Sequence, residues 1–563
     1  MAATVLGAVL RFWGLGAQSL WYDEWSTGEA VDGGLRDLVT YVANREGIPP
    51  PYFGLQWVWV RLVGDGEVGL RSLSALAGVA AIPVAYALVM ALGGRRSVAR
   101  LAALLVAVNP MLVWYSQEAR SYSLLALAGA LSVLALVRLV ERDRRADRMA
   151  WGLAVAAVVA VHWFGAFLVV AEAIAVLAIG RRRGRPWRPI VAACVPAVAV
   201  LALLAPFAVE QHSHTVNRSW ISGFRLVDRL RDAGQTALVG PSPPVGRLWL
   251  AAAVVVGLAI VMVARGGQRR ARWAVAALVG LTAATVGLAL VAAAVGVDAV
   301  VGRYLISTLV PLVVAVAVAL GAARRPWLGL AVGGVLAVVS LVAVVSVARD
   351  PALQRVDWRS VAQAVADDAD GTGNASTGTK DARTGTDDVD TGTASDGTGD
   401  VGTGDANTGN ANTGDGTGDA STGDASTRNA STGTDRTGDR ALVLNIYGVL
   451  ARPLLRYLEH TPSWVLGAGE RARVEEIDVV VPRPTDRPCN LLVGRSCALV
   501  FLGVPPPEPL ASGLHRAGRI ELDQFTIDRY RPDRPVTVTI EDLVAGDTSG
   551  ALVVVVSGGG GSR

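Results

Sequence analysis

Two short polar stretches in the apolar first half of the chain hold the side chains best able to do chemistry. In the first, Asp23 and Glu24 stand next to each other shortly after an apolar start. The second, Gln117–Tyr122, contains Glu118 and Arg120. A carboxylate can act as the general base that activates a hydroxyl group, and a guanidinium can bind a phosphate through paired, charge-assisted hydrogen bonds. The two stretches can form one site only if the surrounding elements bring both to the same face.

The elements that must position these stretches are membrane-spanning helices. Of 563 residues, 52% are hydrophobic and 18% are charged, and the mean hydropathy is +0.41, as is typical of an integral membrane protein. A hydrocarbon core about 30 Å thick requires about 20 apolar residues per helix. Such stretches are predicted near residues 68–92, 101–115, 121–140, 150–165, 164–180, 190–208, 247–264, 273–297, 304–321 and 327–348. With a short first segment, they predict a mostly α, polytopic protein of about 11 spans.

The first apolar segment is too short to cross a bilayer by itself. Only Met1–Leu10 precede Arg11, about half the length that a crossing requires. Either the first helix is truncated or the chain starts farther upstream, and the second interpretation is favoured because Asp23 needs an anchor. The start has no basic region and no small-residue cleavage site, so a cleavable signal peptide is not expected.

Clusters of arginine predict the orientation of the helices. The clusters are Arg95, Arg96 and Arg100; Arg142, Arg144, Arg145 and Arg148; Arg181, Arg182, Arg183, Arg185 and Arg188; Arg265, Arg269, Arg270 and Arg272; and Arg324 and Arg325. Successive clusters are two spans apart, so all can face the cytoplasm of a multi-pass protein of the cell membrane. The alternate loops then face outward with Asp23, Gln117–Tyr122, His162, the His212–His214 loop and Gly302–Tyr304. The pI near 9.1 follows from these clusters, and nucleic acid is not expected as a partner.

An external α/β domain is predicted after Ala348, where the apolar stretches stop. It comprises residues 349–370 and 441–556. Strand-like runs lie at Ala441–Ile446, Ile477–Val481, Leu491–Leu502, Val536–Ile540 and Ala551–Val556, and helix-like pieces near Trp358–Ala366 and Leu450–Leu458. Residues 371–440 interrupt this domain with Thr, Gly, Asp, Ala, Ser and Asn. That insertion has too few apolar side chains to offset the entropy of ordering, so it is expected to be disordered.

Several other polar or sulfur-containing residues have more than one interpretation. Cys489 and Cys497 could form an external disulfide or remain two separate thiols, and Cys194 falls within a span. His212 and His214 lack a third ligand nearby and are interpreted as loop residues. Glu172 falls in mid-span, where a charge costs roughly 2.5–3.5 kcal/mol, so it is protonated, paired or lines a cavity.

A set of motifs resembles a known family when taken together. The motifs are Leu10–Leu15, Leu20–Glu24, Pro49–Tyr52, Gly64–Glu67 with Leu70 and Arg71, Asn109 with Pro110, Trp114–Tyr122, His162–Gly165, Arg303–Leu305 and Asp357–Arg359. In this order they resemble the GT-C membrane glycosyltransferases, and more narrowly glycosyltransferase family 39, with its protein O-mannosyltransferases and aminoarabinose transferases. The resemblance covers residues 1–365 well and the rest loosely. Ile48 stands where many relatives have a His, so the metal binding or acceptor positioning by that His is in doubt here.

The resemblance implies transfer of a sugar from a polyprenyl-phosphate carrier to an external acceptor, which could be a protein, a lipid or a polysaccharide. It implies Asp23 as the base, with Glu24 orienting it or binding the acceptor. The implied substrate-binding residues are Glu118, Arg120, Tyr122, His162, Arg303 and Tyr304. Arg120 and Arg303 would bind the phosphate, and direct displacement would invert the anomeric centre. No cofactor is certain, and a divalent metal is left open.

Two other functions fit part of the sequence. A transporter or flippase of lipid-linked sugars would show internal repeats and broken helices around a midplane site, whereas here the polar groups gather at one face. A non-catalytic assembly factor could keep the same fold, although the intact Asp23 argues against it.

Overall fold

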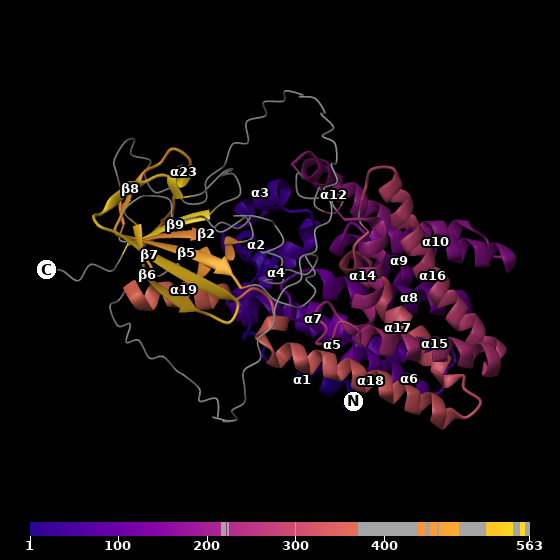
Figure 1. The fold of residues 1–563 in the computed structure, drawn as a ribbon. Coiled ribbons are helices and arrows are strands. Elements are labelled where there is room, and N and C mark those ends of the chain that lie inside the picture. The colour runs from indigo at the N-terminus through magenta and orange to yellow at the C-terminus, as the bar shows by residue number, and fades with distance from the viewer. Residues whose placement is uncertain are drawn as a thin grey trace, which may run out of the picture.

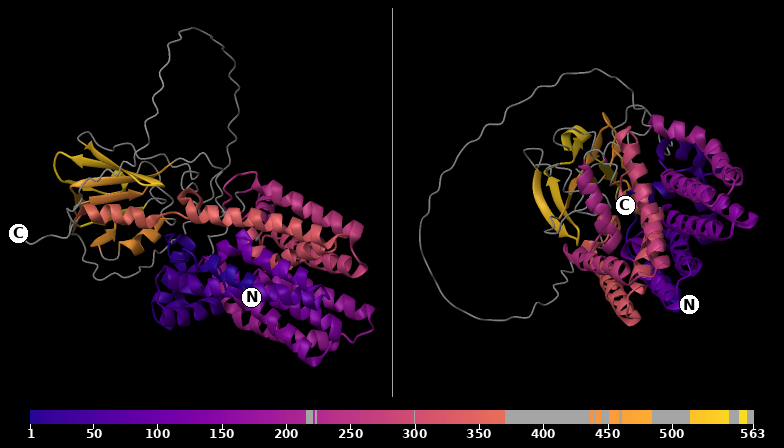
Figure 2. Two further views of the ribbon diagram at one scale, coloured as in Figure 1. Left: turned by 90° about the horizontal axis from the view of Figure 1, so that it is seen from below. Right: turned by 90° about the vertical axis from the view of Figure 1, so that its right-hand side faces the viewer.

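The computed structural model describes residues 1–214, 221, 224–298, 300–369, 436–438, 440–444, 451–458, 461–483, 514–543 and 552–557. The described chain has a helical part and a part built on β-sheet, which lie side by side (Figure 1). Helix α18 (Pro326–Arg349) is the last long helix, and α19 (Trp358–Ala369) follows it against the sheet (Figure 2). The expected order of a helical membrane region followed by a mixed α/β region is therefore found.

The helical part follows the apolar pattern of the sequence closely. Its remaining elements are α1 (Ala2–Phe12), α2 (Tyr22–Asp32), α3 (Leu35–Arg45), α4 (Pro50–Val63), α5 (Glu67–Ala91), α6 (Arg96–Val108), α7 (Pro110–Ser116), α8 (Tyr122–Arg142), α9 (Arg145–Val161), α10 (Gly165–Arg182), α11 (Arg188–Ala193), α12 (Val195–His214), α14 (Leu226–Val239), α15 (Leu248–Gly266), α16 (Arg269–Ala294), the 3-10 helix η2 (Gly302–Thr308) and α17 (Leu309–Gly321). The predicted spans 150–165 and 164–180, which overlap, are separated in the structure by the turn His162–Phe164 between α9 and α10.

Seven helices of the described chain are long and apolar enough to cross a membrane: α5, α8, α12, α15, α16, η2 with α17, and α18. The bent pair α6 and α7 would be an eighth. A helix also forms at each of the other predicted places, but α1 has 11 residues, α9 has 17, and α10 carries Glu172, Arg181 and Arg182. The number of about 11 spans counts these three helices as well. The chain is a membrane protein.

The bend between α6 and α7 follows from Asn109 and Pro110. The two helices meet at 53°, because Pro110 has no N–H to continue the hydrogen-bond ladder of α6. The buried Arg11 supplies the missing donors, with Nη2 donating to the Val106 carbonyl at 3.1 Å and Nη1 to the Ala107 carbonyl at 2.8 Å. The side chain of Asn109 accepts from the Leu112 N–H at 3.0 Å and starts α7. This arrangement fixes the direction in which the chain enters the polar stretch 117–122.

A six-stranded sheet organises the second part of the described chain. Its order is β3 (Ser463–Val465), β9 (Leu552–Val556), β2 (Arg440–Leu444), β5 (Glu476–Pro482), β7 (Phe525–Pro532) and β6 (Leu514–Glu521). β2 and β5 run parallel, and the other neighbours are antiparallel. One face is covered by α19 and α21 (Pro453–Tyr457), with Trp358 and Phe525 in the core between them. Against the other face lie β1 (Arg436–Thr437), β4 (Ala472–Val474) and β8 (Val536–Val538), which form a smaller sheet, and α23 (Ile540–Leu543).

The sequence predicted four strands of this part and missed others that are either very short or rich in charge. β2, β5, β8 and β9 lie at predicted runs, whereas β3, β4, β6 and β7 do not. β6 and β7 are rich in charged residues, chiefly Arg, and Arg519 of β6 donates hydrogen bonds of 2.6 and 2.8 Å to Asp528, which lies opposite it on β7. β1 and the start of β2 fall within the range given to the insertion. Residues 371–435 and 439 of that range lie outside the described residues, as do the run Leu491–Leu502, Cys489 and Cys497.

Candidate active site

The paired acids of the first polar stretch open helix α2. Asp23 and Glu24 lie in its first turn, where the positive end of the helix dipole favours carboxylates. The two neighbours nevertheless meet different surroundings. The Asp23 side chain is 17% exposed, whereas that of Glu24 is fully buried. Adjacent positions on a helix point about 100° apart, so one acid faces the surface and the other the interior.

Glu24 is held in a buried ion pair with Arg71 of α5. Arg71 Nε donates to Glu24 Oε1 and Arg71 Nη2 donates to Glu24 Oε2, both at 2.6 Å. The N–H of Ala119 donates to Oε1 at 3.0 Å. Burial alone would raise the pKa of Glu24, but the charge and hydrogen bonds of Arg71 outweigh burial and hold this pKa below its usual value. Glu24 is therefore an ionised carboxylate whose two oxygens are both occupied.

The turn of residues 118–120 ties three parts of the chain together. Glu118 accepts from Arg355 Nη2 at 3.0 Å, and Ala119 donates to Glu24 as above. Arg120 donates to both carboxylate oxygens of Glu46 at 3.1 Å. It also donates to the backbone carbonyl of Asp23 at 3.2 Å. The second polar stretch thus fixes the backbone that carries the first.

Glu118 is a buried carboxylic group with an altered acidity. Burial raises its pKa to about 7, and the Arg355 guanidinium opposes the rise. Its Oε1 is buried and has no hydrogen-bond partner among the described residues. One carboxylate oxygen of Glu118 therefore accepts a hydrogen bond and the other accepts none from the described residues, whereas both oxygens of Glu24 accept hydrogen bonds.

Arg303 brings a positive charge to the partly exposed carboxylate of Asp23. It lies in η2, and its Nη1 is 3.9 Å from Oδ2 of Asp23. Its guanidinium carbon lies 5.5 Å from the ring centre of Tyr304 and 5.9 Å from those of Trp21 and Tyr122. Such positions over aromatic rings favour a cation, so the rings help to hold Arg303 next to Asp23.

Tyr122, His162 and Tyr304 form an aromatic cluster beside Arg303. The His162 ring centre is 5.3 Å from that of Tyr304 and 5.9 Å from that of Tyr122. His162 Nδ1 accepts from the Phe164 N–H at 3.2 Å, while the buried Nε2 has no partner among the described residues. The cluster therefore holds a buried ring nitrogen that makes no hydrogen bond to the described residues.

The structure thus brings all eight of the expected site residues into one connected region, and it adds Glu46, Arg71 and Arg355. Arg71 belongs to the motif Gly64–Glu67 with Leu70 and Arg71, but nothing in the residues around it indicates that Glu24 is its partner. Glu46 stands two positions before Ile48, and only its burial against Arg120 reveals it. Arg355 lies two residues before the Asp357–Arg359 motif, and its closeness to that motif is the one feature of the sequence that pointed to it.

The other polar residues singled out in the sequence lie apart from this region. Glu172 accepts hydrogen bonds from Ser132 and Trp151, each at 2.7 Å, so it is paired within the helices. His212 is exposed, and the side chain of His214 is outside the described residues. Within the described ranges no group of three or more His, Cys, Asp or Glu side chains could hold a metal ion.

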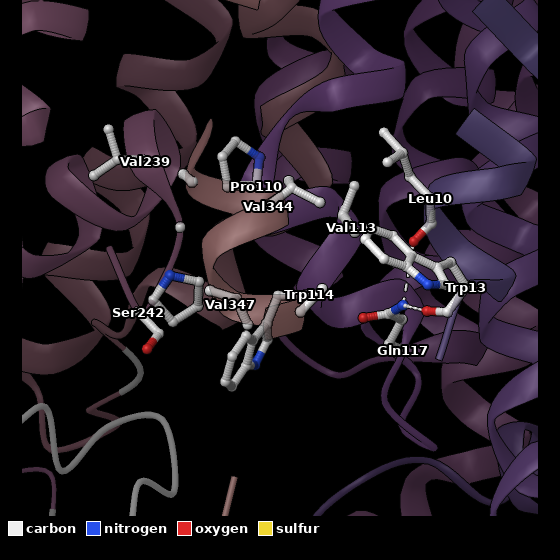
Figure 3. Close-up of a pocket in the computed structure, with 14 residues that line it drawn as sticks. Leu10, Trp13, Pro110, Val113, Trp114, Gln117, Val239, Ser242, Val344 and Val347 are labelled. Atoms are coloured by element: carbon white, nitrogen blue, oxygen red, sulfur yellow. Dashed lines mark hydrogen bonds between the residues drawn. The ribbon is translucent and has the colours of Figure 1, made fainter. Parts of the chain in front are cut away.

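An open, mostly apolar pocket borders the second polar stretch. It lies between α1, α7, the end of α18 and residues 239–242 (Figure 3). Trp114 lines it and is also covered by the Arg355 guanidinium, 4.4 Å from its ring centre. Gln117 closes one side, since its Nε2 donates to the carbonyls of Leu10 and Trp13 (Figure 3). The walls suit an apolar chain.

A family model for dolichyl-phosphate-mannose-protein mannosyltransferase matches residues 60–221. The match confirms the resemblance to the GT-C membrane glycosyltransferases, and no curated protein matches the chain.

Solved structures give weaker likenesses. An oligosaccharyltransferase of Archaeoglobus fulgidus, in complex with Zn and sulfate, is 13% identical over 67% of this chain and 55% of its own, with a TM-score of 0.41. ArnT of Cupriavidus metallidurans bound to undecaprenyl phosphate is 16% identical over 57% of this chain and 59% of its own, with a TM-score of 0.40. The Pmt1-Pmt2 complex of S. cerevisiae bound to the sugar donor is 20% identical over 38% of this chain and 33% of that chain, with a TM-score of 0.30. The chain thus spans less than two thirds of the length of these proteins.

Proposed function

We propose that this chain, whose residues 60–221 match the dolichyl-phosphate-mannose-protein mannosyltransferase family, is a membrane glycosyltransferase. It moves a sugar from a polyprenyl-phosphate donor to an acceptor hydroxyl at the external face. The observation that carries this proposal is the pair of Asp23 and Arg303, a reachable carboxylate with a guanidinium 3.9 Å away. Sugar transfer from a lipid phosphate needs a base for the acceptor hydroxyl and a cation for the leaving phosphate, and the two must lie close together.

Asp23 takes the role of general base. The acceptor hydroxyl must lose its proton as it attacks the anomeric carbon. Asp23 is partly exposed, whereas Glu24 is buried and fully bound, so Asp23 is the carboxylate that an acceptor can reach. The bond from the anomeric carbon to the phosphate oxygen breaks as the new bond forms, and the configuration inverts.

Arg303 stabilises the phosphate that leaves. A lipid phosphate carries its charge away without a proton, so cationic stabilisation serves it better than a general acid. Both terminal nitrogens of Arg120 are bound to Glu46, which neutralises its charge. Arg303 instead lies 3.9 Å from the partly exposed Asp23, beside the proposed base. Of the two arginines proposed from the sequence, we therefore assign the phosphate to Arg303, and Arg120 holds the backbone of Asp23.

Glu24 acts as a positioning residue and not as an acceptor ligand. Oε1 accepts from Arg71 Nε and the Ala119 N–H, and Oε2 accepts from Arg71 Nη2 and, at 3.4 Å, the Trp21 N–H, so each oxygen already accepts two hydrogen bonds. By binding both residues, Glu24 fixes α2 against α5 and against the 118–120 turn. The orientation of Asp23 depends on this connection.

The placement of the site outside the membrane rests on the arginine clusters. Arg270 donates to the Leu92 carbonyl at 2.9 Å, and Arg183 donates to that of Val140, so separate clusters meet at shared helix ends. By the positive-inside rule these ends face the cytoplasm. The site then lies on the opposite side of the cell membrane, where a lipid-linked donor is needed because nucleotide sugars are absent.

One observation favours a second candidate, a flippase of lipid-linked sugars: the broken pair α6 and α7 resembles the interrupted helices of transporters. A single experiment separates the two. The lipid-linked sugar that accumulates when the gene is deleted is purified and supplied to vesicles that contain the protein. Release of the free lipid phosphate together with a glycosylated acceptor supports the transferase, whereas movement of the intact lipid-linked sugar across the bilayer supports the flippase.

A further inference from the structure

The segment that leads to Asp23 has no secondary structure of its own. Residues Gln18–Leu20 lie between α1 and α2 and are neither helix nor strand, so their backbone groups need partners from elsewhere. On one side Arg71 supplies them. Its Nη1 donates to the Gln18 carbonyl at 2.7 Å, and its Nη2 donates to the Ser19 carbonyl at 2.9 Å.

On the other side the partners come from the chain beyond the last membrane helix. The side-chain oxygen of Gln18 accepts from the Arg355 N–H at 3.1 Å. Ser19 Oγ donates to Asp357 Oδ1 at 2.7 Å. These contacts join residues more than 330 positions apart in the sequence.

Tyr457 of the sheet part holds the last residue of this segment, Leu20. Its hydroxyl oxygen accepts from the Leu20 N–H at 2.7 Å, and the hydroxyl donates to Glu67 at 3.1 Å. Leu20 is 1% exposed, so no solvent replaces this partner. Tyr457 ends α21, the short helix that packs on the sheet and also contacts α2.

A second contact of the same region reaches α2 itself. Arg452, at the start of α21, lies with its guanidinium carbon 5.8 Å from the ring centre of Trp25. The start of α2 is thus held between α5 of the membrane part and α21 of the sheet part.

We propose that the sheet part clamps the segment that carries the base, and that Tyr457 is a positioning residue for Asp23. This inference rests on the proposed function, because it assigns the base to Asp23. Tyr457 touches neither reacting group. It fixes the Leu20 amide three residues ahead of Asp23, and misplacement of a reacting group by about 1 Å can lower a rate about 10²-fold.

The test compares two tyrosines of the sheet part in the full-length protein. Y457F removes only the hydroxyl that holds Leu20. Y530F removes a hydroxyl from β7, on a strand that pairs with β5 and not with the membrane part. We expect Y457F to lower kcat at least tenfold while the KM for the lipid donor stays within twofold. Y530F should leave both constants within twofold of wild type.

Amide hydrogen exchange gives a readout that needs no activity. In Y457F the Leu20 amide should exchange at least tenfold faster than in wild type, and in Y530F at the wild-type rate. Unchanged exchange in Y457F overturns the clamp, even if the chain transfers no sugar at all. Faster exchange with an unchanged kcat overturns the positioning role. If Y457F does not fold, S19A takes its place, because it removes the neighbouring contact to Asp357. Its kcat, its KM for the lipid donor and the exchange rate of the Leu20 amide are then measured, with the same expected changes.

Discussion

Arg71 and Glu24 form a buried ion pair with two hydrogen bonds of 2.6 Å, although 47 positions separate them in the sequence. Arg71 is 1% exposed and Glu24 fully buried. The guanidinium of Arg71 uses its remaining donors on the carbonyls of Leu15, Gln18 and Ser19. One arginine of a membrane helix therefore fixes both the acid next to the proposed base and the segment ahead of it.

Loss of Glu24 should destabilise the fold. E24Q leaves the Arg71 charge buried without its counter-charge, which costs about 3–5 kcal/mol for a buried pair. We expect a lower midpoint of unfolding in detergent and less protein in the membrane. The double variant E24Q/R71Q should recover part of this loss, because no unpaired charge remains. D32N, at the exposed end of the same helix, is the control, and a stability of E24Q equal to that of D32N would contradict the structural role.

Replacement of Asp23 should remove transfer without removing donor binding. D23N keeps the size of the side chain and loses its basicity, and a general base contributes about 10²–10⁴-fold in rate. The affinity for the lipid donor should stay within a few-fold of wild type. Transfer assays and donor-binding measurements in the same membranes check both expectations. Transfer by D23N within about threefold of wild type would rule out this base.

Replacement of Arg303 should weaken donor binding. A hydrogen bond to a charged group contributes about 1.5–3 kcal/mol, so R303A should bind the donor roughly 10- to 100-fold less tightly. R303K keeps the charge but not the planar pair of donors and should fall between R303A and wild type. Binding is measured in the D23N background, where the donor is not consumed. R225A, an exposed arginine at the start of α14, is the matched control, and equal losses in R225A and R303A would refute a specific phosphate contact.

Glu118 should make stability depend on pH. Burial raises its pKa to about 7, against about 4.3 in an unfolded chain, so the folded protein holds this proton more tightly. The stabilisation is complete below about pH 4 and is lost as the pH rises through about 7. The free energy of unfolding of wild type minus that of E118Q should therefore decrease between about pH 5 and pH 8. Unfolding curves at several pH values test this, and a difference that stays constant or increases would show that Glu118 does not titrate in this window.

The division of roles between Asp23 and Glu24 could not be predicted from their neighbouring positions. A helix turn directs one to the surface and the other to the interior, and the burial of Glu24 depends on Arg71 of another helix. The same limit applies to Arg120, whose partner Glu46 lies 74 positions away, and to Glu118, whose partner Arg355 lies 237 positions away. A local pattern carries no information about which distant charge will be its neighbour.

The sequence by itself determined the membrane character, the places of the apolar helices and the polar stretches that meet in the site. These follow from local composition, because each helix must present about 20 apolar residues to the lipid whatever its neighbours are. The strands β6 and β7 were missed, since they lack the apolar pattern of a strand and their charged pairs, such as Arg519 with Asp528, are visible only once the strands lie side by side. Only the tertiary structure decided that the chain beyond α18 returns to hold Gln18–Leu20. Backbone groups without secondary structure take partners from whatever packs against them, and packing between distant segments is set by the whole fold.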